Sequence, residues 1–254
     1  MTAAWVPGDS ASTFDARKVF DRDYLHFYAP RLTDRRSDAE AQLIWELLGL
    51  EPGMETLDLA CGQGRIANRL AARGCRVTGL DTVPLFLEDA RRDAVARDVA
   101  VDYVEGDMRM LPWVERFDRV ISWSTSFGYF DDTANRQVLT QAARALKTGG
   151  LIVFDLNNRD WLVREFQPTI VVERDGDMLI DRNRLEPLTG RVVTERIVVR
   201  EGRIRRLSFF VRLFTFTELR DWLLAAGFTD VDGYGNDGAP LSSACSRLLA
   251  VARR

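Results

Sequence analysis

Apolar, β-branched runs alternate with amphipathic segments between residues 55 and 156. The pattern predicts strands over 55–60, 76–81, 101–105, 117–122 and 151–156, and helices near 64–73, 84–97 and 133–147. Because strands that are apolar along their whole length need cover on both faces, the alternation predicts a doubly wound parallel sheet between helical layers. Ligands of such folds bind beyond the carboxyl ends of the strands, where the strand order reverses.

The first predicted strand runs directly into a glycine turn, Asp58-Leu59-Ala60-Cys61-Gly62-Gln63-Gly64. A turn without large side chains lets a ligand lie against bare backbone at a helix N-terminus. Asp58 stands inside the apolar strand, where a carboxylate is costly unless something pairs with it. The stretch therefore predicts a cofactor site, although the spacing Gly62-x-Gly64-x-x-Ala67 alone equally fits a dinucleotide fingerprint.

Two further carboxylates follow neighbouring strands. Asp81 ends the second strand, about 20 residues after the glycines, which is the spacing expected for an acceptor of ribose hydroxyls. Asp107 follows the third strand, and the fourth strand runs into Trp123 and a segment rich in Ser, Thr and aromatic residues. Since the carboxyl ends of parallel strands meet at one edge of a sheet, these side chains are expected to lie close together.

The regions outside this alternation divide the chain further. Residues 1–13 resemble a loose tail, an aromatic-rich helical segment follows over 14–32, and a second helix has Ser37 as its candidate N-cap. Extended segments near 169–174, 178–186, 191–200 and 203–215 predict antiparallel hairpins. A helix over 217–226, with Thr217 as candidate N-cap, and strands near 229–234 and 246–252 complete the core.

These patterns predict three parts. Residues 1–50 form an N-terminal tail and helical cap, and residues 51–160 and 215–254 form the cofactor-binding core. Residues 161–214 form a small antiparallel β insert, which serves as a substrate lid or as the contact of a homodimer.

Composition narrows the class of protein. A net charge of −3 gives no sign of a nucleic-acid surface, and the three cysteines form neither a disulfide framework nor a metal motif. The single histidine, His26, excludes a metal site built from several histidines. Neither a signal peptide nor an apolar run of about 20 residues is present, so we expect a cytoplasmic protein that needs no metal, membrane or nucleic acid.

Several ordered segments together resemble the motifs of class I S-adenosylmethionine-dependent methyltransferases. They are Leu57-Asp58-Leu59-Ala60-Cys61-Gly62-Gln63-Gly64, Gly79-Leu80-Asp81, Glu105-Gly106-Asp107-Met108, Leu146-Lys147-Thr148-Gly149-Gly150 and the stretch from Phe216 to Phe228. The resemblance implies a Rossmann-like, seven-stranded, mostly parallel sheet with an antiparallel last strand. It also implies S-adenosylmethionine as methyl donor and S-adenosylhomocysteine as product.

The segment after the fourth predicted strand narrows the class of acceptor. The segment 122–130 lacks the Asn/Asp-Pro-Pro-aromatic signature of enzymes that methylate DNA bases or protein glutamine. It is similar to small-molecule methyltransferases of bacterial secondary metabolism. We therefore expect transfer by in-line displacement to a nitrogen or oxygen atom of a small molecule, with carbon as a weaker alternative.

The resemblance also implies roles for individual residues. Asp58 would contact the amino group of the methionine part, Asp81 would hold both ribose hydroxyls, and Asp107 would accept from the adenine amine. The implied cofactor residues are Tyr28, Asp58, Ala60, Gly62, Gly64, Asp81, Thr82, Gly106, Asp107, Met108, Ser122 and Trp123. The implied substrate residues are Tyr24, Trp123, Phe127, Tyr129, Asn157 and Arg212, and the candidate general bases are His26, Tyr129 and Asp131.

Two alternatives remain open from the residues alone. A protein of the same fold could keep the cofactor without transferring its methyl group. A nicotinamide-dependent oxidoreductase could use the Gly62-x-Gly64-x-x-Ala67 turn, although Asp107 and the closing Ala226-Gly227-Phe228 pattern argue against it.

Overall fold

The computed structural model describes residues 14–254, so the predicted tail over 1–13 lies outside the described residues. The N-terminal elements are α1 (Ala16–Val19), α2 (Arg22–Tyr28), the short 3₁₀ helix η1 (Ala29–Arg31) and α3 (Asp34–Leu48). The core consists of β1 (Glu55–Leu59), α4 (Ala67–Ala72), β2 (Arg76–Asp81), α5 (Pro84–Ala96), β3 (Val101–Glu105), β4 (Phe117–Ser122), α6 (Asp132–Ala145), β5 (Leu146–Asn157), α8 (Phe216–Ala225), β10 (Asp230–Tyr234) and β11 (Arg247–Arg253).

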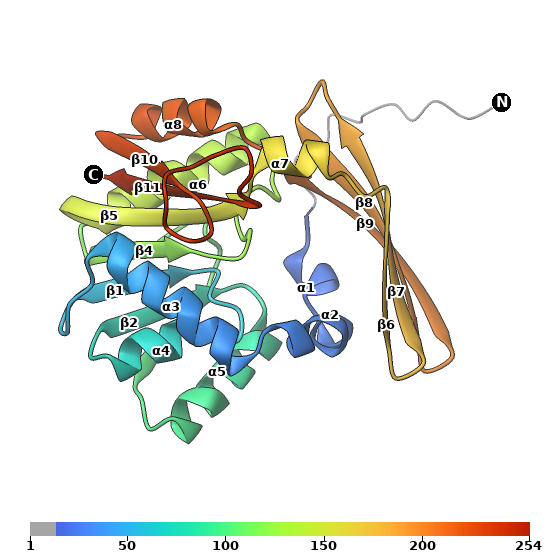
Figure 1. Ribbon diagram of the computed structural model, residues 1–254. Coiled ribbons are helices and arrows are strands. Elements are labelled where there is room, and N and C mark those ends of the chain that lie inside the picture. The colour runs from blue at the N-terminus through green and yellow to red at the C-terminus, as the bar shows by residue number, and fades with distance from the viewer. Residues whose placement is uncertain (1–13) are drawn as a thin grey trace.

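The central sheet has seven strands in the order β10-β11-β5-β4-β1-β2-β3. Strands β1 to β5 pair in parallel, whereas β11 runs antiparallel to both of its neighbours, β5 and β10. The order reverses beside β1, which places the end of β1 at the position where doubly wound folds bind ligands. The predicted fold class, with its antiparallel last strand, is confirmed (Figure 1).

Helices cover both faces of this sheet and form two apolar cores. One core joins the strands to α6 and α8 through residues such as Val138, Leu139 and Trp222. The other joins them to α3, α4 and α5 through residues such as Ile44 and Leu87. Burial on both faces explains why the strands read as continuous apolar runs.

The predicted aromatic helix over 14–32 is broken into α1, α2 and η1. Asp15 and Asp21 each accept a backbone N–H at a helix start, so a new helix begins at Arg22 and the chain turns at Phe20. The N-cap of α3 is Thr33, which accepts from the N–H of Arg36, and not Ser37. Likewise, α8 is capped by Thr215 rather than by Thr217. In each case two hydroxyl residues stand near one helix start, and the earlier one makes the capping bond.

The insert forms its own antiparallel sheet, β6 (Thr169–Arg174), β7 (Asp177–Glu186), β8 (Arg191–Arg200) and β9 (Arg203–Arg212), after a short helix α7 (Arg159–Arg164) that the sequence did not predict. The sheet stands beside the core, with α1 and α2 between them (Figure 1). Phe27 of α2 packs into an apolar cluster with Val172, Leu179 and Val198. Through this contact the insert supports the N-terminal helices, and its use as a dimer contact stays a prediction.

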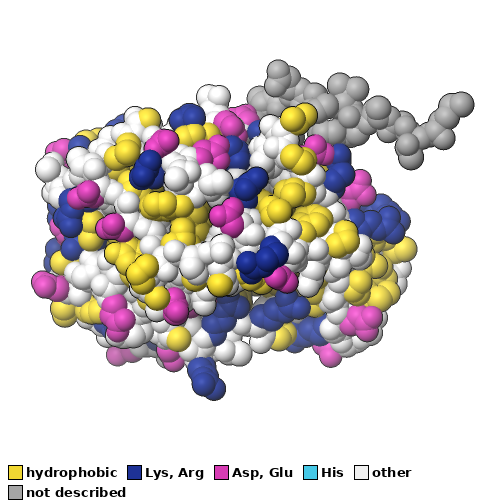
Figure 2. Space-filling model, turned by 45° about the horizontal axis from the view of Figure 1, so that its top comes forward, with side chains coloured by type: hydrophobic (Ala, Val, Ile, Leu, Met, Phe, Trp, Pro, Cys, Tyr) yellow, Lys and Arg dark blue, Asp and Glu magenta, His cyan; other side chains and the backbone are white. Residues whose placement is uncertain are grey.

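Ion pairs strengthen the contact between α2 and the insert. Arg200 and Arg205 reach Asp23 at 3.0 and 2.9 Å, and Arg205 also pairs with Asp21 at 2.6 Å. On the face drawn in Figure 2, basic and acidic side chains are interspersed with hydrophobic ones. Among residues 14–254, no helix is long and apolar enough to cross a membrane. The same residues contain no group of three or more His, Cys, Asp or Glu placed to hold a metal ion.

Candidate functional site

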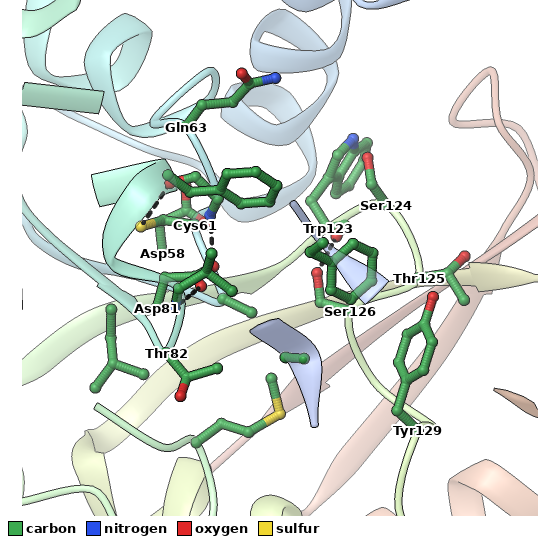
Figure 3. Close-up of a pocket in the computed structure, with 18 of the residues that line it drawn as sticks. Asp58, Cys61, Gln63, Asp81, Thr82, Trp123, Ser124, Thr125, Ser126 and Tyr129 are labelled. Carbon is green, nitrogen blue, oxygen red and sulfur yellow. Dashed lines mark hydrogen bonds between the residues drawn. The ribbon is translucent and has the colours of Figure 1, made fainter. Parts of the chain in front are cut away.

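A cleft opens beyond the carboxyl ends of β1, β2 and β4, between the glycine turn and the N-terminal helices. Its cavity volume is about 300 Å³. In Figure 3, residues of the glycine turn and the end of β2 lie on one side, and residues of the segment after β4 face them. Since pockets for one small ligand commonly measure about 300–1,000 Å³, the cleft has the size of a small-ligand pocket.

The glycine turn is held in an unusual backbone conformation. Ala60 and Gly62 have φ values of 62° and 55°, in the left-handed region that a side chain disfavours. The N–H of Gly62 donates to Asp81 Oδ2 at 2.8 Å, and the N–H of Cys61 donates to the carbonyl of Leu80 at 3.0 Å. These bonds tie the turn after β1 to the end of β2, so the two predicted cofactor segments form one unit.

Asp58 and Asp81 are both buried, with exposed fractions of 2% and 6%. Burial raises the pKa of the Asp58 carboxyl to about 7, with a smaller upward contribution from Asp81, while Arg65 acts in the opposite direction. Burial also raises the pKa of Asp81, although the backbone N–H groups that it accepts partly offset the rise. Buried carboxylates of this kind favour a cationic or hydroxyl-bearing partner.

Asp107 is tied to its neighbour Arg109. The backbone N–H of Arg109 donates to Asp107 Oδ1 at 2.8 Å, and its guanidinium donates to both carboxylate oxygens. Burial pushes the pKa of Asp107 upward, but the hydrogen bonds from Arg109 outweigh it and hold that pKa below its ordinary value. The guanidinium also lies 4.4 Å from the ring centre of Phe130. Asp107 and Arg109 therefore act as one polar unit at the cleft wall.

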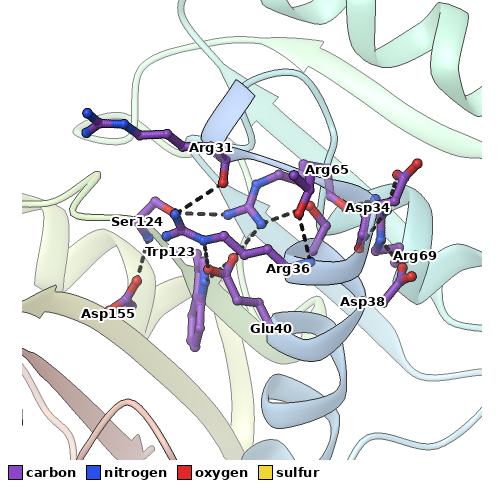
Figure 4. A network of polar contacts seen from close by, with 12 residues as sticks. Arg31, Asp34, Arg36, Asp38, Glu40, Arg65, Arg69, Trp123, Ser124 and Asp155 are labelled. Atoms are coloured by element: carbon purple, nitrogen blue, oxygen red, sulfur yellow. Dashed lines mark hydrogen bonds and ion pairs between the residues drawn. The ribbon is translucent and has the colours of Figure 1, made fainter. Parts of the chain in front are cut away.

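A polar network links the glycine turn to α3 and to the segment after β4 (Figure 4). Arg65 pairs with Glu40 and donates to Ser124 Oγ at 3.0 Å and to Ser37 Oγ at 3.2 Å. The indole N–H of Trp123 donates to Glu40 Oε2 at 3.1 Å. Trp123 is thereby fixed with its ring against the cleft. Arg65 also lines the cleft and supplies a cation there.

Aromatic rings from three segments line the cleft opposite the turn. Phe14 stacks on Tyr129 with ring centres 4.6 Å apart, and Phe20 lies 5.6 Å from Tyr129 and 5.1 Å from Tyr24. Burial is the main reason why the pKa of the Tyr129 phenol lies well above its ordinary value. The phenol thus stays protonated and can donate a hydrogen bond, whereas it is poorly suited to accept a proton as a general base.

Most of the predicted site residues come together at this cleft. Those that line it are Tyr24, Asp58, Ala60, Gly62, Asp81, Thr82, Gly106, Asp107, Met108, Trp123 and Tyr129. The sequence reasoning missed Phe14, Phe20, Arg65, Phe86, Arg109 and Phe130, which also line it. A signal existed for Arg65, because it follows the second glycine of the turn directly.

Other predicted site residues lie elsewhere, and packing explains their positions. His26 Nε2 lies 3.2 Å from Asp177 Oδ2 of the insert, and His26 is not among the residues that line the cleft. Phe127 is fully buried against Phe154 and Phe214. Asp131 caps α6 by accepting from the N–H of Ala134 at 2.8 Å.

The remaining predicted residues also serve structural contacts. Arg212 pairs with Glu218 and lies over the ring of Phe214, because β9 ends against the core instead of facing solvent. Asn157 accepts from Arg247 at 2.6 Å. Three others lie beside the cleft but outside its lining. Tyr28 stacks on Tyr24, Gly64 packs on Tyr103, and Ser122 is buried in β4.

Comparison with known proteins identifies the family. A family model described as a methyltransferase domain matches residues 56–150. A demethylmenaquinone methyltransferase of Thermus thermophilus is 31% identical over 215 residues, which cover 79% of this chain and 89% of that protein.

Two solved structures share the fold across nearly the whole chain. The CcbJ methyltransferase of Streptomyces caelestis superimposes with a TM-score of 0.77 at 22% identity, covering 94% of this chain and 99% of that one. An S-adenosylmethionine-dependent methyltransferase of Clostridium acetobutylicum gives a TM-score of 0.76 at 17% identity, with the same coverage. At these identities the likeness shows a common fold, whereas the matched domain and the T. thermophilus relative show the family: the chain belongs to the class I S-adenosylmethionine-dependent methyltransferases.

Proposed function

We propose that this enzyme transfers the methyl group of S-adenosylmethionine to a nitrogen or oxygen atom of a small molecule bound between Trp123 and the aromatic wall. The aromatic wall consists of Phe14, Phe20, Tyr24 and Tyr129. The observation that carries the proposal is that this wall and the glycine turn line the same cleft. The T. thermophilus relative is a demethylmenaquinone methyltransferase, so its acceptor is a small molecule, which supports the same class here.

The residues of the turn fit the proposed cofactor. A Cβ added to Gly62 would come no closer than 3.8 Å to a neighbouring atom, so the turn leaves open space beside its backbone. Asp81 presents a buried carboxylate suited to ribose hydroxyls, and Asp58 presents one suited to the ammonium of the methionine part. Arg65 stands at the same wall, where it suits the methionine carboxylate.

Methyl transfer requires mainly that the protein hold the acceptor atom and the methyl donor in the right positions. When bound, S-adenosylmethionine supplies an electrophilic methyl group on a sulfonium. Holding the acceptor in line at about 3–3.5 Å can supply roughly 7–11 kcal/mol of barrier reduction. The aromatic wall gives this space an apolar lining, and ring faces tolerate a positive charge.

The electrostatics favour nitrogen over oxygen as the acceptor. Among residues 14–254 no histidine lines the cleft, and the Tyr129 phenol is held in its protonated form. A hydroxyl acceptor gains from a general base by about 10²–10⁴-fold. The aromatic wall offers none, since the carboxylates of Asp58 and Asp81 stand on the side of the glycine turn, where they are assigned to the cofactor. An uncharged amine needs no base before it attacks, and the ammonium product would face the aromatic rings.

An acceptor comparison tests this preference. The enzyme is incubated with S-adenosylmethionine labelled on its methyl group and with either phenethylamine or phenethyl alcohol, which differ only in the nucleophilic atom. We expect label in the amine and not in the alcohol. Faster labelling of the alcohol would overturn the preference for nitrogen. Titration calorimetry with S-adenosylhomocysteine and with NAD provides the cofactor control.

Cofactor affinity should depend on pH through Asp58. Because the pKa of Asp58 is raised to about 7, the carboxyl is protonated below that pH and attracts an ammonium less. We expect the affinity for S-adenosylhomocysteine to rise about tenfold between about pH 5.5 and about pH 7, measured by calorimetry. The Asp58→Asn variant should bind more weakly and show a flat profile. The same steep profile in that variant would show that another group titrates.

A further inference from the structure

The segment after β4 carries two successive residues in a disfavoured backbone conformation. Ser124 and Thr125 have φ values of 60° and 58°, although neither is glycine. Left-handed backbone is uncommon for residues with a side chain, and more so for a β-branched residue such as Thr125. Such a conformation persists only where surrounding contacts enforce it.

Asp155 and Arg247 make those contacts. Asp155 Oδ2 accepts from the N–H of Ser124 at 2.8 Å, and its main-chain carbonyl accepts from the N–H of Thr125 at 2.9 Å. Arg247 donates to Asp155 Oδ1 at 2.7 Å, to Thr125 Oγ1 at 2.9 Å and to Asn157 Oδ1 at 2.6 Å. Asp155 is only 4% exposed, whereas the Arg247 side chain keeps 25% of its surface exposed.

The two residues come from two neighbouring inner strands of the sheet. Asp155 lies on β5 and Arg247 begins β11, two antiparallel neighbours in which Arg247 stands opposite Asn157. The pair therefore connects the rigid sheet to a segment that is otherwise held mainly by side chains. Figure 4 shows the bond from Ser124 to Asp155 on one side and Arg65 on the other.

The segment that the pair holds supplies one wall of the cleft. Trp123, Ser124, Thr125, Ser126 and Tyr129 all line it. Trp123 immediately precedes the left-handed turn, and Tyr129 follows it by four residues. A change in the backbone at the turn would therefore move both rings relative to the glycine turn.

We propose that Asp155 and Arg247 are positioning residues, which enforce the left-handed turn at Ser124 and Thr125 and so align Trp123 and Tyr129 for methyl transfer. Neither residue lines the cleft, so both act through the turn. The catalytic part of this inference rests on the proposed function, since it places the acceptor beside Tyr129.

The test replaces Arg247 by Met, which removes the guanidinium and keeps a long apolar side chain. Crystals of the wild-type enzyme and of Arg247→Met, both with S-adenosylhomocysteine, should show Ser124 and Thr125 leaving the left-handed region in the variant. Misplacement of reacting groups by about 1 Å can cost about 10²-fold in rate, so we expect kcat to fall at least about tenfold. The affinity for S-adenosylhomocysteine should stay within about threefold, because the glycine turn is untouched.

A second substitution separates positioning from loss of stability. In Arg247→Met/Thr125→Gly, glycine adopts the left-handed conformation without the guanidinium, and most of the lost kcat should return. Arg253→Met, an exposed arginine on the same strand, serves as the matched control and should leave kcat unchanged. If Arg247→Met folds poorly, Arg247→Lys takes its place. This variant keeps a hydrogen-bond donor and should give an intermediate kcat.

Each result decides the proposal. An unchanged turn and unchanged kcat in Arg247→Met would overturn it, as would a loss that Thr125→Gly does not relieve. The rate is measured with phenethylamine as acceptor. If the wild-type enzyme does not methylate this amine, the acceptor proposal fails, whereas the crystal structures still show whether Arg247 holds the turn.

Discussion

Asp81→Ala is expected to weaken binding of S-adenosylhomocysteine by about 10²-fold, the larger of the two affinity changes predicted for this site. The two ribose hydroxyls of the ligand would lose the buried carboxylate as their acceptor, and hydrogen bonds to charged groups contribute about 1.5–3 kcal/mol each. The substitution also removes the acceptor for the N–H groups of Gly62 and Val83, each now bonded at 2.8 Å. Titration calorimetry measures the dissociation constant.

Asp102→Ala is the matched control, because Asp102 lies on the adjacent strand β3 but is exposed. Its dissociation constant should equal that of the wild-type enzyme. Thermal unfolding of both variants checks that the fold is intact. A folded Asp81→Ala enzyme whose affinity stays within about threefold of wild type would remove Asp81 from the cofactor site.

The sequence predicted the central sheet well because its signals are local. Strands β2, β3 and β4 have the predicted bounds, since each apolar run ends at a polar residue that also ends the pairing. Strand β5 begins earlier than predicted, at Leu146 rather than at 151. Residues 147–150 join the sheet because the backbone N–H of Gly149 donates to the carbonyl of Arg254, and the N–H of Arg254 donates to the carbonyl of Gly150. No local sequence pattern indicates these hydrogen bonds to the end of the chain.

The site was predicted where it follows strand ends and missed where it depends on packing. Asp58, Asp81 and Asp107 follow from their spacing along the chain. The contribution of Phe14 and Phe20 depends on how α1 and α2 fold over the cleft, and that arrangement is set by the insert about 150 residues away. His26 is a candidate general base from the sequence, yet α2 turns it toward Asp177 and the insert.

Gly64 shows how a motif residue can serve the fold rather than the ligand. Its φ is +73°, and a Cβ there would stand directly against the Tyr103 hydroxyl and 2.9 Å from the Cβ of Ala90. The Tyr103 hydroxyl cannot move aside freely, because it donates to Asn68 Oδ1 at 2.6 Å in a buried site. The second glycine of the turn therefore permits close packing of α4, α5 and β3, while Gly62 faces the cleft.

Gly64→Ala is accordingly expected to lower the free energy of unfolding by about 2–4 kcal/mol. About 1 kcal/mol comes from the left-handed backbone, and about 1–3 kcal/mol from overpacking against Tyr103. Gly49→Ala is the matched control, since Gly49 has a φ of +54° with no described atom within 4 Å of an added Cβ. That control should lose only the backbone contribution, as measured by urea unfolding.

A double-mutant cycle with Tyr103→Phe isolates the contact itself. Removing the phenol oxygen makes room for the added methyl group, so Gly64→Ala should cost at least about 1 kcal/mol less in the Tyr103→Phe background than in the wild type. A cost no larger than that of Gly49→Ala would mean that the glycine is needed only for its backbone conformation. Equal costs in both backgrounds would assign the overpacking to Ala90 and not to the Tyr103 hydroxyl. A cycle with the expected sign would assign Gly64 to the packing that holds the turn in place, whereas Gly62 of the same motif faces the cleft.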